Sequence, residues 1–137
     1  MKRLIAMLQR QEGLRLKPYL CTADKLTIGY GRNLEDMGIS EDEATYLLQT
    51  DIDRCYSELS VFTWFHELDQ IRQEALISML FNLGLPRFLT FKKMIARLKE
   101  KRYSEAANEM IRSRWALQVG ERANELAYMV ERGEYLI

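Results

Sequence analysis

The sequence is poor in proline, cysteine and histidine, and it has no excess charge. Its 137 residues include 2 Pro, 2 Cys and 1 His, and 20 Lys and Arg balance 20 Asp and Glu. Cys21 and Cys55 are too few for a disulfide scaffold, so we expect both thiols to be reduced. No cluster of Cys or Asp accompanies His66, which predicts no metal site and no cofactor. The balanced charge excludes a polycation that binds nucleic acid by bulk charge, and we expect no nucleic-acid partner.

Long hydrophobic runs are absent as well. No stretch approaches the ~18 apolar residues of a transmembrane helix, so no membrane insertion is expected. Arg10 interrupts the apolar residues at the N-terminus too early for the core of a signal peptide, so we expect no export segment. The sequence is 47% hydrophobic and 29% charged, which is typical of one folded domain with a buried core.

Apolar residues recur at helical spacing over most of the sequence, which predicts a mostly helical α+β fold. Ser40 and Glu43 form a capping box that opens a long amphipathic helix, while Gly84 and Pro86 end the helix expected to lie at the centre of the core. Helices are predicted over residues 4–12, 40–59, 68–83, 91–98, 104–112 (with Ser104 as its N-cap) and 121–130. The alternating pattern and glycines of residues 14–33 predict a small β-hairpin or meander, followed by a loop over 33–38.

Three side chains near the N-terminus could converge on one site. Glu12 ends the first predicted helix, where a carboxylate faces the negative end of the helix dipole at a cost of roughly 0.3–1 kcal/mol. Cys21 falls in the predicted hairpin turn and Thr27 on its return strand. A carboxyl that can donate a proton, a thiol, and a hydroxyl that can orient water would then line one cleft. The alternative is that Glu12 is an ordinary surface glutamate and Thr27 an ordinary strand residue.

The spacing of these three residues also resembles that of a known family. Glu12 is followed by eight residues, Cys21, five residues and Thr27. This spacing resembles the phage-type lysozymes of glycoside hydrolase family 24, in which the middle residue is Asp or Cys. The likeness continues in order through residues 14–19, 27–31, 39–44, 75–84, 101–107, 113–115 and 122–123. The chain lacks a segment between Gly31 and Ile39 that the longer T-even enzyme has, so a smaller β lobe is expected.

The resemblance implies a single lysozyme-like domain over residues 1–137. A β-containing lobe at about 13–39 would be joined by an interlobe helix at about 40–60 to a helical lobe at about 61–137, which would also include the N-terminal helix. The implied activity is hydrolysis, with inversion, of the β-1,4 bond between N-acetylmuramic acid and N-acetylglucosamine in peptidoglycan.

The resemblance also implies roles for single residues. Glu12 would be the catalytic acid, kept protonated by burial. Arg122 would position Glu12 or the substrate. Asn33, Phe81, Asn82 and Arg122 match substrate-binding positions of the family, whereas Met94 and Glu109 stand where the family more often has a small hydroxyl and an amide.

Cys21 stands where the family more often has Asp. A free thiol has a pKa of ~8.5 and is only a few per cent thiolate at pH 7, and a nearby carboxylate would lower that fraction further. In one hypothesis Cys21 accepts a hydrogen bond from the attacking water, or deprotonates it, while Thr27 holds that water. In the other, the thiolate attacks the sugar and the configuration is retained.

Peptidoglycan glycan strands are the partner implied for a monomeric phage or prophage endolysin. Such an enzyme would stay in the host cytoplasm until a holin lesion releases it to the periplasm and cell wall. One alternative is a catalytically silent cell-wall or protein-binding module on the same fold. Another is a small DNA-binding protein, which the balanced charge argues against. Basic residues between Lys92 and Arg102 predict a solvated helix face or an attraction to anionic wall polymers.

Overall fold

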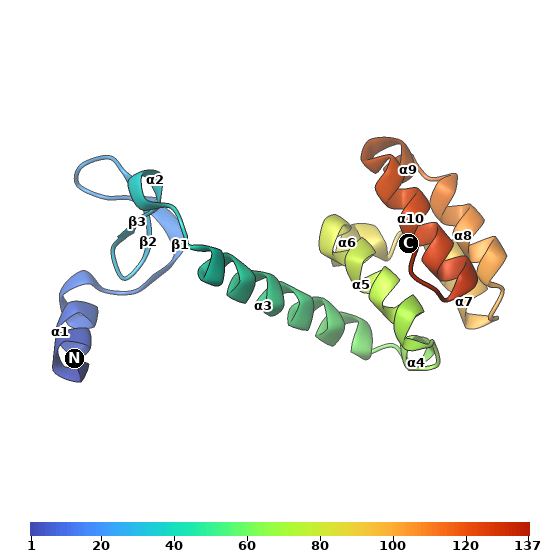
Figure 1. Ribbon diagram of the computed structural model, residues 1–137, viewed down its shortest axis with the longest axis horizontal. Coiled ribbons are helices and arrows are strands. Elements are labelled where there is room, and N and C mark those ends of the chain that lie inside the picture. Colours follow the sequence, from blue (N-terminus) through green and yellow to red (C-terminus); the bar gives the residue numbers. More distant parts are fainter. The chain divides into compact units, whose positions relative to one another are not determined.

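The computed structural model describes all 137 residues, which form two compact units, Met1–Leu47 and Leu48–Ile137 (Figure 1). The boundary falls inside the long helix α3 (Glu41–Ser60). Ten helices and one small sheet confirm the predicted α+β, mostly helical fold class. None of the helices combines the length and apolar character needed to cross a membrane.

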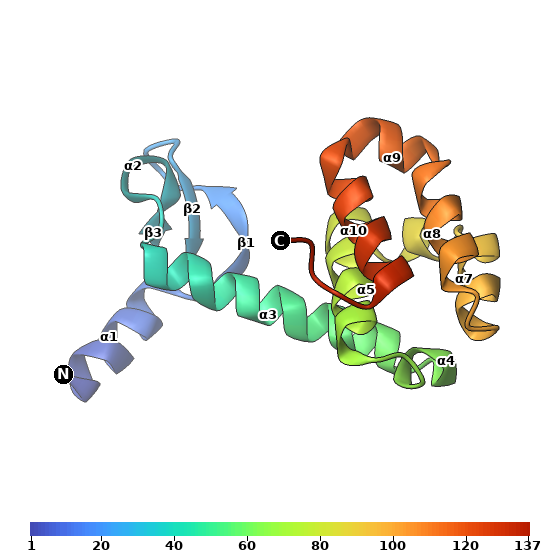
Figure 2. The ribbon, with the colours of Figure 1, turned by 45° about the vertical axis from the view of Figure 1, so that its right-hand side comes forward.

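The first unit contains the sheet. Its elements are α1 (Lys2–Glu12), β1 (Arg15–Leu20), β2 (Leu26–Gly29), β3 (Arg32–Asn33), α2 (Leu34–Met37) and the start of α3. The three strands form an antiparallel meander in the order β1-β2-β3, as the sequence predicts (Figure 2). Thr27 lies on the central strand, opposite Tyr19 of β1 and Asn33 of β3. The pairing therefore holds Thr27 from both sides.

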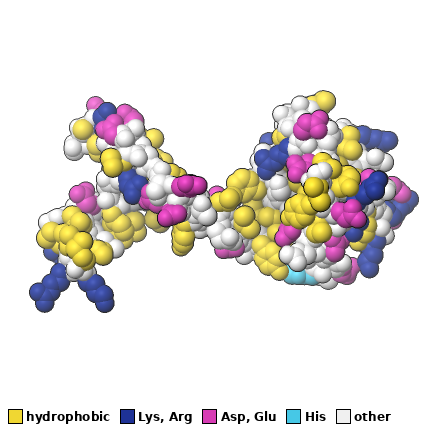
Figure 3. All heavy atoms as spheres, viewed as in Figure 1, with side chains coloured by type: hydrophobic (Ala, Val, Ile, Leu, Met, Phe, Trp, Pro, Cys, Tyr) yellow, Lys and Arg dark blue, Asp and Glu magenta, His cyan; other side chains and the backbone are white.

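The first unit buries very little of its own surface. Thr27 is its only buried residue, and α1 buries none of its side chains. Apolar side chains therefore cover the surface of α1, with basic side chains beyond them at its N-terminal end (Figure 3). Polar contacts must then supply much of the order in this unit.

One of these contacts begins a helix that the sequence does not predict. The expected loop over residues 33–38 is wrong, because α2 occupies residues 34–37. The side-chain oxygen of Asn33 accepts a hydrogen bond from Asp36 N at 3.0 Å and caps the helix. Glu35 and Asp36 in the first turn also favour the positive end of the helix dipole.

The predicted capping box is confirmed at the start of α3. Glu43 N donates to Ser40 Oγ at 3.1 Å, and Ser40 N donates to Glu43 Oε1 at 2.8 Å. Arg32 of β3 adds a bidentate pair to the same carboxylate, at 3.0 and 2.8 Å. The Glu43 carboxylate thus joins the last strand of the sheet to the first turn of α3.

The second unit has an apolar core. Its helices after α3 are α4 (Thr63–His66), α5 (Gln70–Leu83), α6 (Leu85–Phe88), α7 (Lys92–Lys99), α8 (Tyr103–Ile111), α9 (Arg114–Val119) and α10 (Glu121–Arg132). Helix α10 packs against both α5 and α8, and α7 packs against α8. Five residues of α5 are buried, which confirms its predicted central place: Ala75, Leu76, Met79, Leu80 and Leu83. Cys55, Trp64 and Trp115 are also buried.

Some helix limits differ from the predictions. The predicted N-cap Ser104 is wrong, because α8 begins one residue earlier, at Tyr103, and its N-cap is Arg102. Lys101 adopts a positive φ of 60°, which turns the chain just before this helix, and the Ser104 hydroxyl donates to Glu131 instead. The helices α4, α6 and α9 lie where no separate helix is predicted, because four to six residues are too few to show a helical period.

Acid should weaken the connection between β3 and α3. The hydrogen bonds from Arg32, followed by those from Ser40, lower the pKa of Glu43 to about 2. A lowered folded-state pKa stabilises the fold above the ordinary pKa of about 4.5, and this stabilisation is lost as the pH falls toward about 2. Hydrogen exchange corrected for intrinsic rates should therefore show protection of residues 32–44 falling over this range. In Glu43→Gln the protection should be lower at pH 7 and should not show that step.

Glu41→Gln is the matched control, since Glu41 lies in the same first turn of α3 and makes no ion pair. It should keep the acid-dependent step. Equal acid dependence in wild type and Glu43→Gln would contradict the role given to this carboxylate.

Candidate active site

A tight turn between β1 and β2 places Cys21. Cys21 N donates to Lys25 O at 3.0 Å, and Asp24 N donates to Cys21 O at 2.8 Å. Asp24 adopts a φ of 58°, which a non-glycine residue seldom does outside such turns. Cys21 therefore lies in the hairpin turn and Thr27 on the return strand, as predicted.

The carbonyl oxygen of Lys25 connects these two residues. It accepts one hydrogen bond from Cys21 N, and a second from Thr27 Oγ1 at 2.8 Å. The Thr27 hydroxyl is buried, and its one hydrogen is used in this bond. Its remaining lone pairs can only accept, so a water bound to Thr27 would have to donate a hydrogen to it.

The same turn changes the chemistry of the thiol. Hydrogen bonds from the backbone amides of Lys25 and Ala23 lower the pKa of Cys21. The sulfur is partly exposed and free of any disulfide. The sequence-based expectation of a thiol with less thiolate than usual is therefore wrong, because it considered neighbouring carboxylates and not the amides of the turn.

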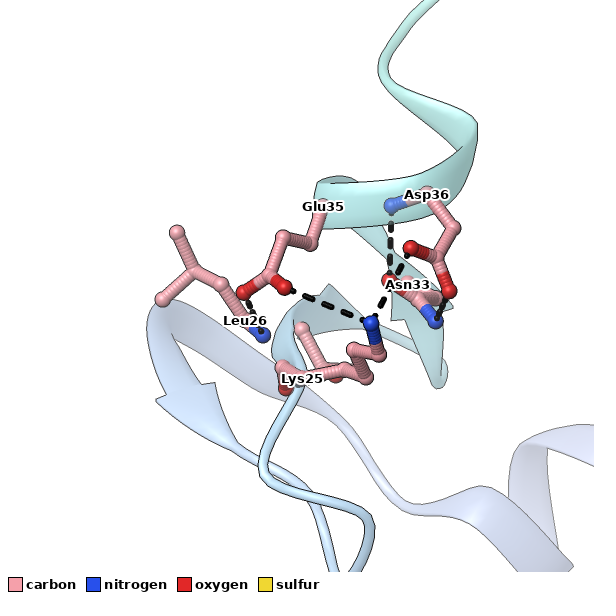
Figure 4. Close-up of polar contacts among 6 residues, drawn as sticks. Lys25, Leu26, Asn33, Glu35 and Asp36 are labelled. Carbon is pink, nitrogen blue, oxygen red and sulfur yellow. Dashed lines mark hydrogen bonds and ion pairs between the residues drawn. The ribbon is translucent and has the colours of Figure 1, made fainter.

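The side chain of Lys25 fixes the turn to α2 (Figure 4). Its ammonium lies 3.5 Å from Glu35 Oε2 and 3.4 Å from Asp36 Oδ1. Glu35 also accepts a hydrogen bond from Leu26 N at 3.3 Å, while Asp36 accepts one from Asn33 Nδ2 at 2.9 Å. The α2 turn thus contacts Lys25 and Leu26, which precede Thr27, and Asn33, which pairs with Thr27.

Glu12 lies against the glycine-rich end of the hairpin. It is the last residue of α1, and a Cβ atom at Gly31 would stand 2.7 Å from its Oε2. Gly31 has a φ of 75°, which glycine adopts without strain. The burial expected for Glu12 is not observed, since its side chain is exposed at the end of a helix that buries no side chain.

Asn33 also belongs to this unit. Besides capping α2, it lines an open pocket of about 1100 Å³ together with Gly31, Tyr30 and Tyr46. Its amide is bonded to Asp36 through both the oxygen and the nitrogen.

The other three predicted binding residues lie in the second unit. Phe81 is exposed on α5, with 40% of its surface accessible. Asn82 Oδ1 accepts a hydrogen bond from Trp115 Nε1 at 2.7 Å, which leaves the Asn82 amide hydrogens free. Arg122 donates from Nη2 to Ser78 O at 3.3 Å and to Ser78 Oγ at 3.4 Å.

The structure thus brings Cys21 and Thr27 together through Lys25, places Glu12 beside Gly31, and pairs Thr27 with Asn33. Sequence reasoning missed Lys25, because its contribution comes mostly from a backbone carbonyl that any residue would supply. The only sign of its importance in the sequence is that Lys25 stands two residues before Thr27 and that two acidic residues, Glu35 and Asp36, follow within the same segment. No group of three or more His, Cys, Asp and Glu side chains is arranged to hold a metal ion.

Comparison with known proteins agrees with the resemblance found in the sequence. The family described as "Phage lysozyme" matches residues 9–133. A "Probable T4-type lysozyme 1" of Dictyostelium discoideum is 29% identical over 157 aligned positions, covering 93% of this chain and 92% of that protein. An "Endolysin" of Acyrthosiphon pisum secondary endosymbiont phage 1 is 32% identical, covering 79% of this chain and 75% of that protein. The alignment of 157 positions is longer than this chain of 137 residues, so the amoebal protein has residues without a counterpart here.

The lowered pKa of Cys21 can be measured by alkylation. Since the turn amides stabilise the thiolate, iodoacetamide should modify Cys21 with a pH midpoint below that of the same residue in the urea-unfolded chain. By the same linkage, the folded state of the wild type should gain stability relative to Cys21→Ser above the unfolded thiol pKa. That gain is lost as the pH falls through the folded pKa.

Cys55 is the internal control for this measurement. Burial raises the pKa of Cys55, so its peptide should remain unmodified in the folded chain under the same conditions. A midpoint for folded Cys21 at or above that of the unfolded chain would contradict the assignment.

Proposed function

Because the chain belongs to the phage lysozyme family, we propose that it acts as an endolysin and hydrolyses the β-1,4 bond between N-acetylmuramic acid and N-acetylglucosamine. Membership of this family establishes that the chain is a lysozyme-type peptidoglycan hydrolase. The observation that supports the finer proposal best is the Cys21–Lys25 turn, because its amides lower the pKa of the Cys21 thiol and its carbonyl oxygen engages the only hydrogen of the Thr27 hydroxyl.

Glycoside hydrolysis needs a proton donor at the leaving oxygen and a group that prepares the attacking water. We assign the first role to Glu12, whose carboxyl lies beside the backbone of Gly31. It would transfer its proton to the oxygen of the departing N-acetylglucosamine as the glycosidic bond breaks.

Cys21 and Thr27 would prepare the water. Thr27 has given its only hydrogen to Lys25 O, so it would accept one hydrogen of the water, and the thiolate of Cys21 would take the proton released as the water oxygen attacks the anomeric carbon. The acid loses one proton and the thiolate gains one, so charge and protons balance. Attack from the face opposite the leaving group inverts the anomeric configuration.

The substrate-binding assignments are proposals of the same kind. Asn82 has free amide hydrogens for an acetamido carbonyl, and Arg122 has guanidinium N–H groups beyond those bonded to Ser78. Phe81 offers an exposed ring for the apolar face of a sugar. Asn33 completes the set on the first unit. We further propose that residues 1–137 act as one lysozyme-like domain, as a monomer that waits in the host cytoplasm for holin-dependent release.

Replacement of the acid tests the activity directly. Glu12→Gln removes the transferable proton but keeps the size of the side chain, so clearing of chloroform-treated Gram-negative cells should slow by at least about 100-fold. Glu41→Gln, an exposed glutamate on α3, should clear them at the wild-type rate. Equal clearing rates for Glu12→Gln and wild type would contradict the role given to Glu12, and no clearing by wild type would favour a catalytically silent binding module.

The product anomer tests the role of Cys21. In the proposed mechanism the first turnover gives the α anomer by NMR, Cys21→Asp remains active, and Cys21→Ala loses more than about tenfold, or roughly 1.4 kcal/mol of transition-state stabilisation. A β product at the first turnover would show retention and make Cys21 the nucleophile. A smaller loss in Cys21→Ala would remove Cys21 from the reaction altogether.

A further inference from the structure

The peptide group between Lys25 and Leu26 connects the candidate active site to helix α2. Its carbonyl oxygen, on Lys25, accepts hydrogen bonds from Cys21 N at 3.0 Å and from Thr27 Oγ1 at 2.8 Å. Its N–H, on Leu26, donates to Glu35 Oε1 at 3.3 Å. Glu35 therefore holds one end of a planar group whose other end is bound by the two reactive residues.

The two ends of this peptide group cannot turn independently. No peptide bond of the chain is cis, and in a trans peptide the C=O and N–H bonds point in opposite directions within one plane. A hydrogen bond that fixes the direction of the Leu26 N–H therefore also fixes the direction of the Lys25 C=O. Rotation of the plane away from Glu35 would turn the carbonyl oxygen away from Cys21 N and Thr27 Oγ1 together.

The sheet offers the Leu26 N–H no acceptor of its own. The carbonyl oxygen of Lys25 points to the side of β1, so the N–H of the same peptide group points to the side of β3. β3 is only two residues long and ends at Asn33, which pairs with Thr27. No strand residue therefore lies opposite Leu26 on that side, and the Glu35 carboxylate takes the place of the missing acceptor.

Short connections fix the position of Glu35 itself. Asn33 pairs with Thr27 through the backbone and caps α2 through its side chain, so α2 begins directly beside the central strand. Glu35 is the second residue of this helix. Its second carboxylate oxygen, Oε2, lies 3.5 Å from Lys25 Nζ, and the same ammonium lies 3.4 Å from Asp36 Oδ1 (Figure 4). The ammonium thus keeps the Glu35 carboxylate next to the peptide group.

Stability alone does not explain these contacts. The side chains of Lys25, Glu35 and Asp36 are between 40% and 55% exposed, and ion pairs between exposed groups contribute little to the free energy of unfolding. The rate of a reaction depends much more steeply on geometry, since a misplacement of about 1 Å can slow it by about 100-fold. A weak but directional contact can therefore matter more for hydrolysis than for the fold.

We propose that Glu35 is a positioning residue for the hydrolysis, which acts through the peptide group that it holds and does not touch the substrate. This inference rests on the proposed function. Glu35 would keep the Thr27 hydrogen on Lys25 O, so that the remaining lone pairs of the hydroxyl face the attacking water. It would also keep the turn closed around the Cys21 sulfur.

Substitutions of Glu35 separate its hydrogen bond from its charge. Glu35→Ala removes both, and on a soluble peptidoglycan fragment it should lower kcat by at least about tenfold and change KM by less than about threefold, because no contact with the substrate is lost. Glu35→Gln keeps an oxygen that can accept from Leu26 N, so its kcat should fall by less than about threefold.

Glu41→Ala is the matched control, because Glu41 is an exposed glutamate of the same unit that makes no ion pair. It should match the wild type in kcat and KM. Equal kcat values for Glu35→Ala and wild type would overturn the proposal, as would equal losses in Glu35→Ala and Glu35→Gln. A loss confined to KM would make Glu35 a substrate contact, and thermal unfolding of Glu35→Ala below the assay temperature would make it a structural residue. Either result would also overturn the proposal.

Two measurements follow the peptide group without any hydrolysis. By NMR, the Leu26 amide proton of the wild type should shift as the Glu35 carboxylate is protonated in acid, and this step should be absent in Glu35→Gln and kept in Glu41→Ala. The pH midpoint for alkylation of Cys21 should rise in Glu35→Ala, because the turn amides move away from the sulfur, and it should stay near the wild-type value in Glu35→Gln.

These two measurements also keep a failure of the proposed function apart from a failure of this inference. No hydrolysis by wild type would contradict the proposed function, while the Leu26 amide and the Cys21 midpoint would still decide whether Glu35 holds the peptide group. An acid step at Leu26 that persists in Glu35→Gln, or equal Cys21 midpoints in Glu35→Ala and wild type, would overturn the inference and leave the proposed function standing.

Discussion

The backbone carbonyl of Lys25 is the contact on which the candidate site depends. It accepts hydrogen bonds from Cys21 N and from the Thr27 hydroxyl, and thereby sets the shape of the turn and the direction of the hydroxyl together. The turn then aims the amides of Ala23 and Lys25 at the sulfur, which favours the thiolate. The Lys25 carbonyl oxygen thus links the position of the Thr27 hydroxyl to the ionisation of the Cys21 thiol.

The two units obtain their order in different ways. The second unit buries a continuous apolar core around α5 and α10, in which side chains such as Phe65 and Leu76 are fully enclosed. The first unit buries only Thr27, and its turn and strands are joined by charged contacts between Lys25 and α2 and between Arg32 and Glu43. Contacts of this kind are directional but exposed, so the geometry around Cys21 is more sensitive to salt and acid than the core.

The sequence predicted those features that depend on side-chain pattern. The reciprocal Ser40–Glu43 cap, the central helix ending at Gly84, and the placement of Cys21 and Thr27 on the hairpin all follow from residue type and spacing, and the structure confirms them. It did not predict features that depend on backbone conformation. The α2 turn, the start of α8 after Lys101 and the amides around Cys21 all require torsion angles that several residue types could adopt.

The roles proposed for the site residues follow from the family resemblance. Spacing identified Glu12, Cys21 and Thr27 as candidates. It gave no sign that the Thr27 hydrogen is already engaged, which determines the direction in which this hydroxyl can bind water.

The contact between Gly31 and Glu12 has a consequence for how this chain can vary. The Glu12 carboxyl group fills the space that a side chain at residue 31 would need. Even one methyl group there would lie 2.7 Å from the Glu12 Oε2 atom. Any side chain there must displace the acid or distort a backbone already at φ 75°. The position of the acid therefore depends on an absence of atoms at residue 31, and a substitution there could displace the carboxyl group while Glu12 itself stayed unchanged.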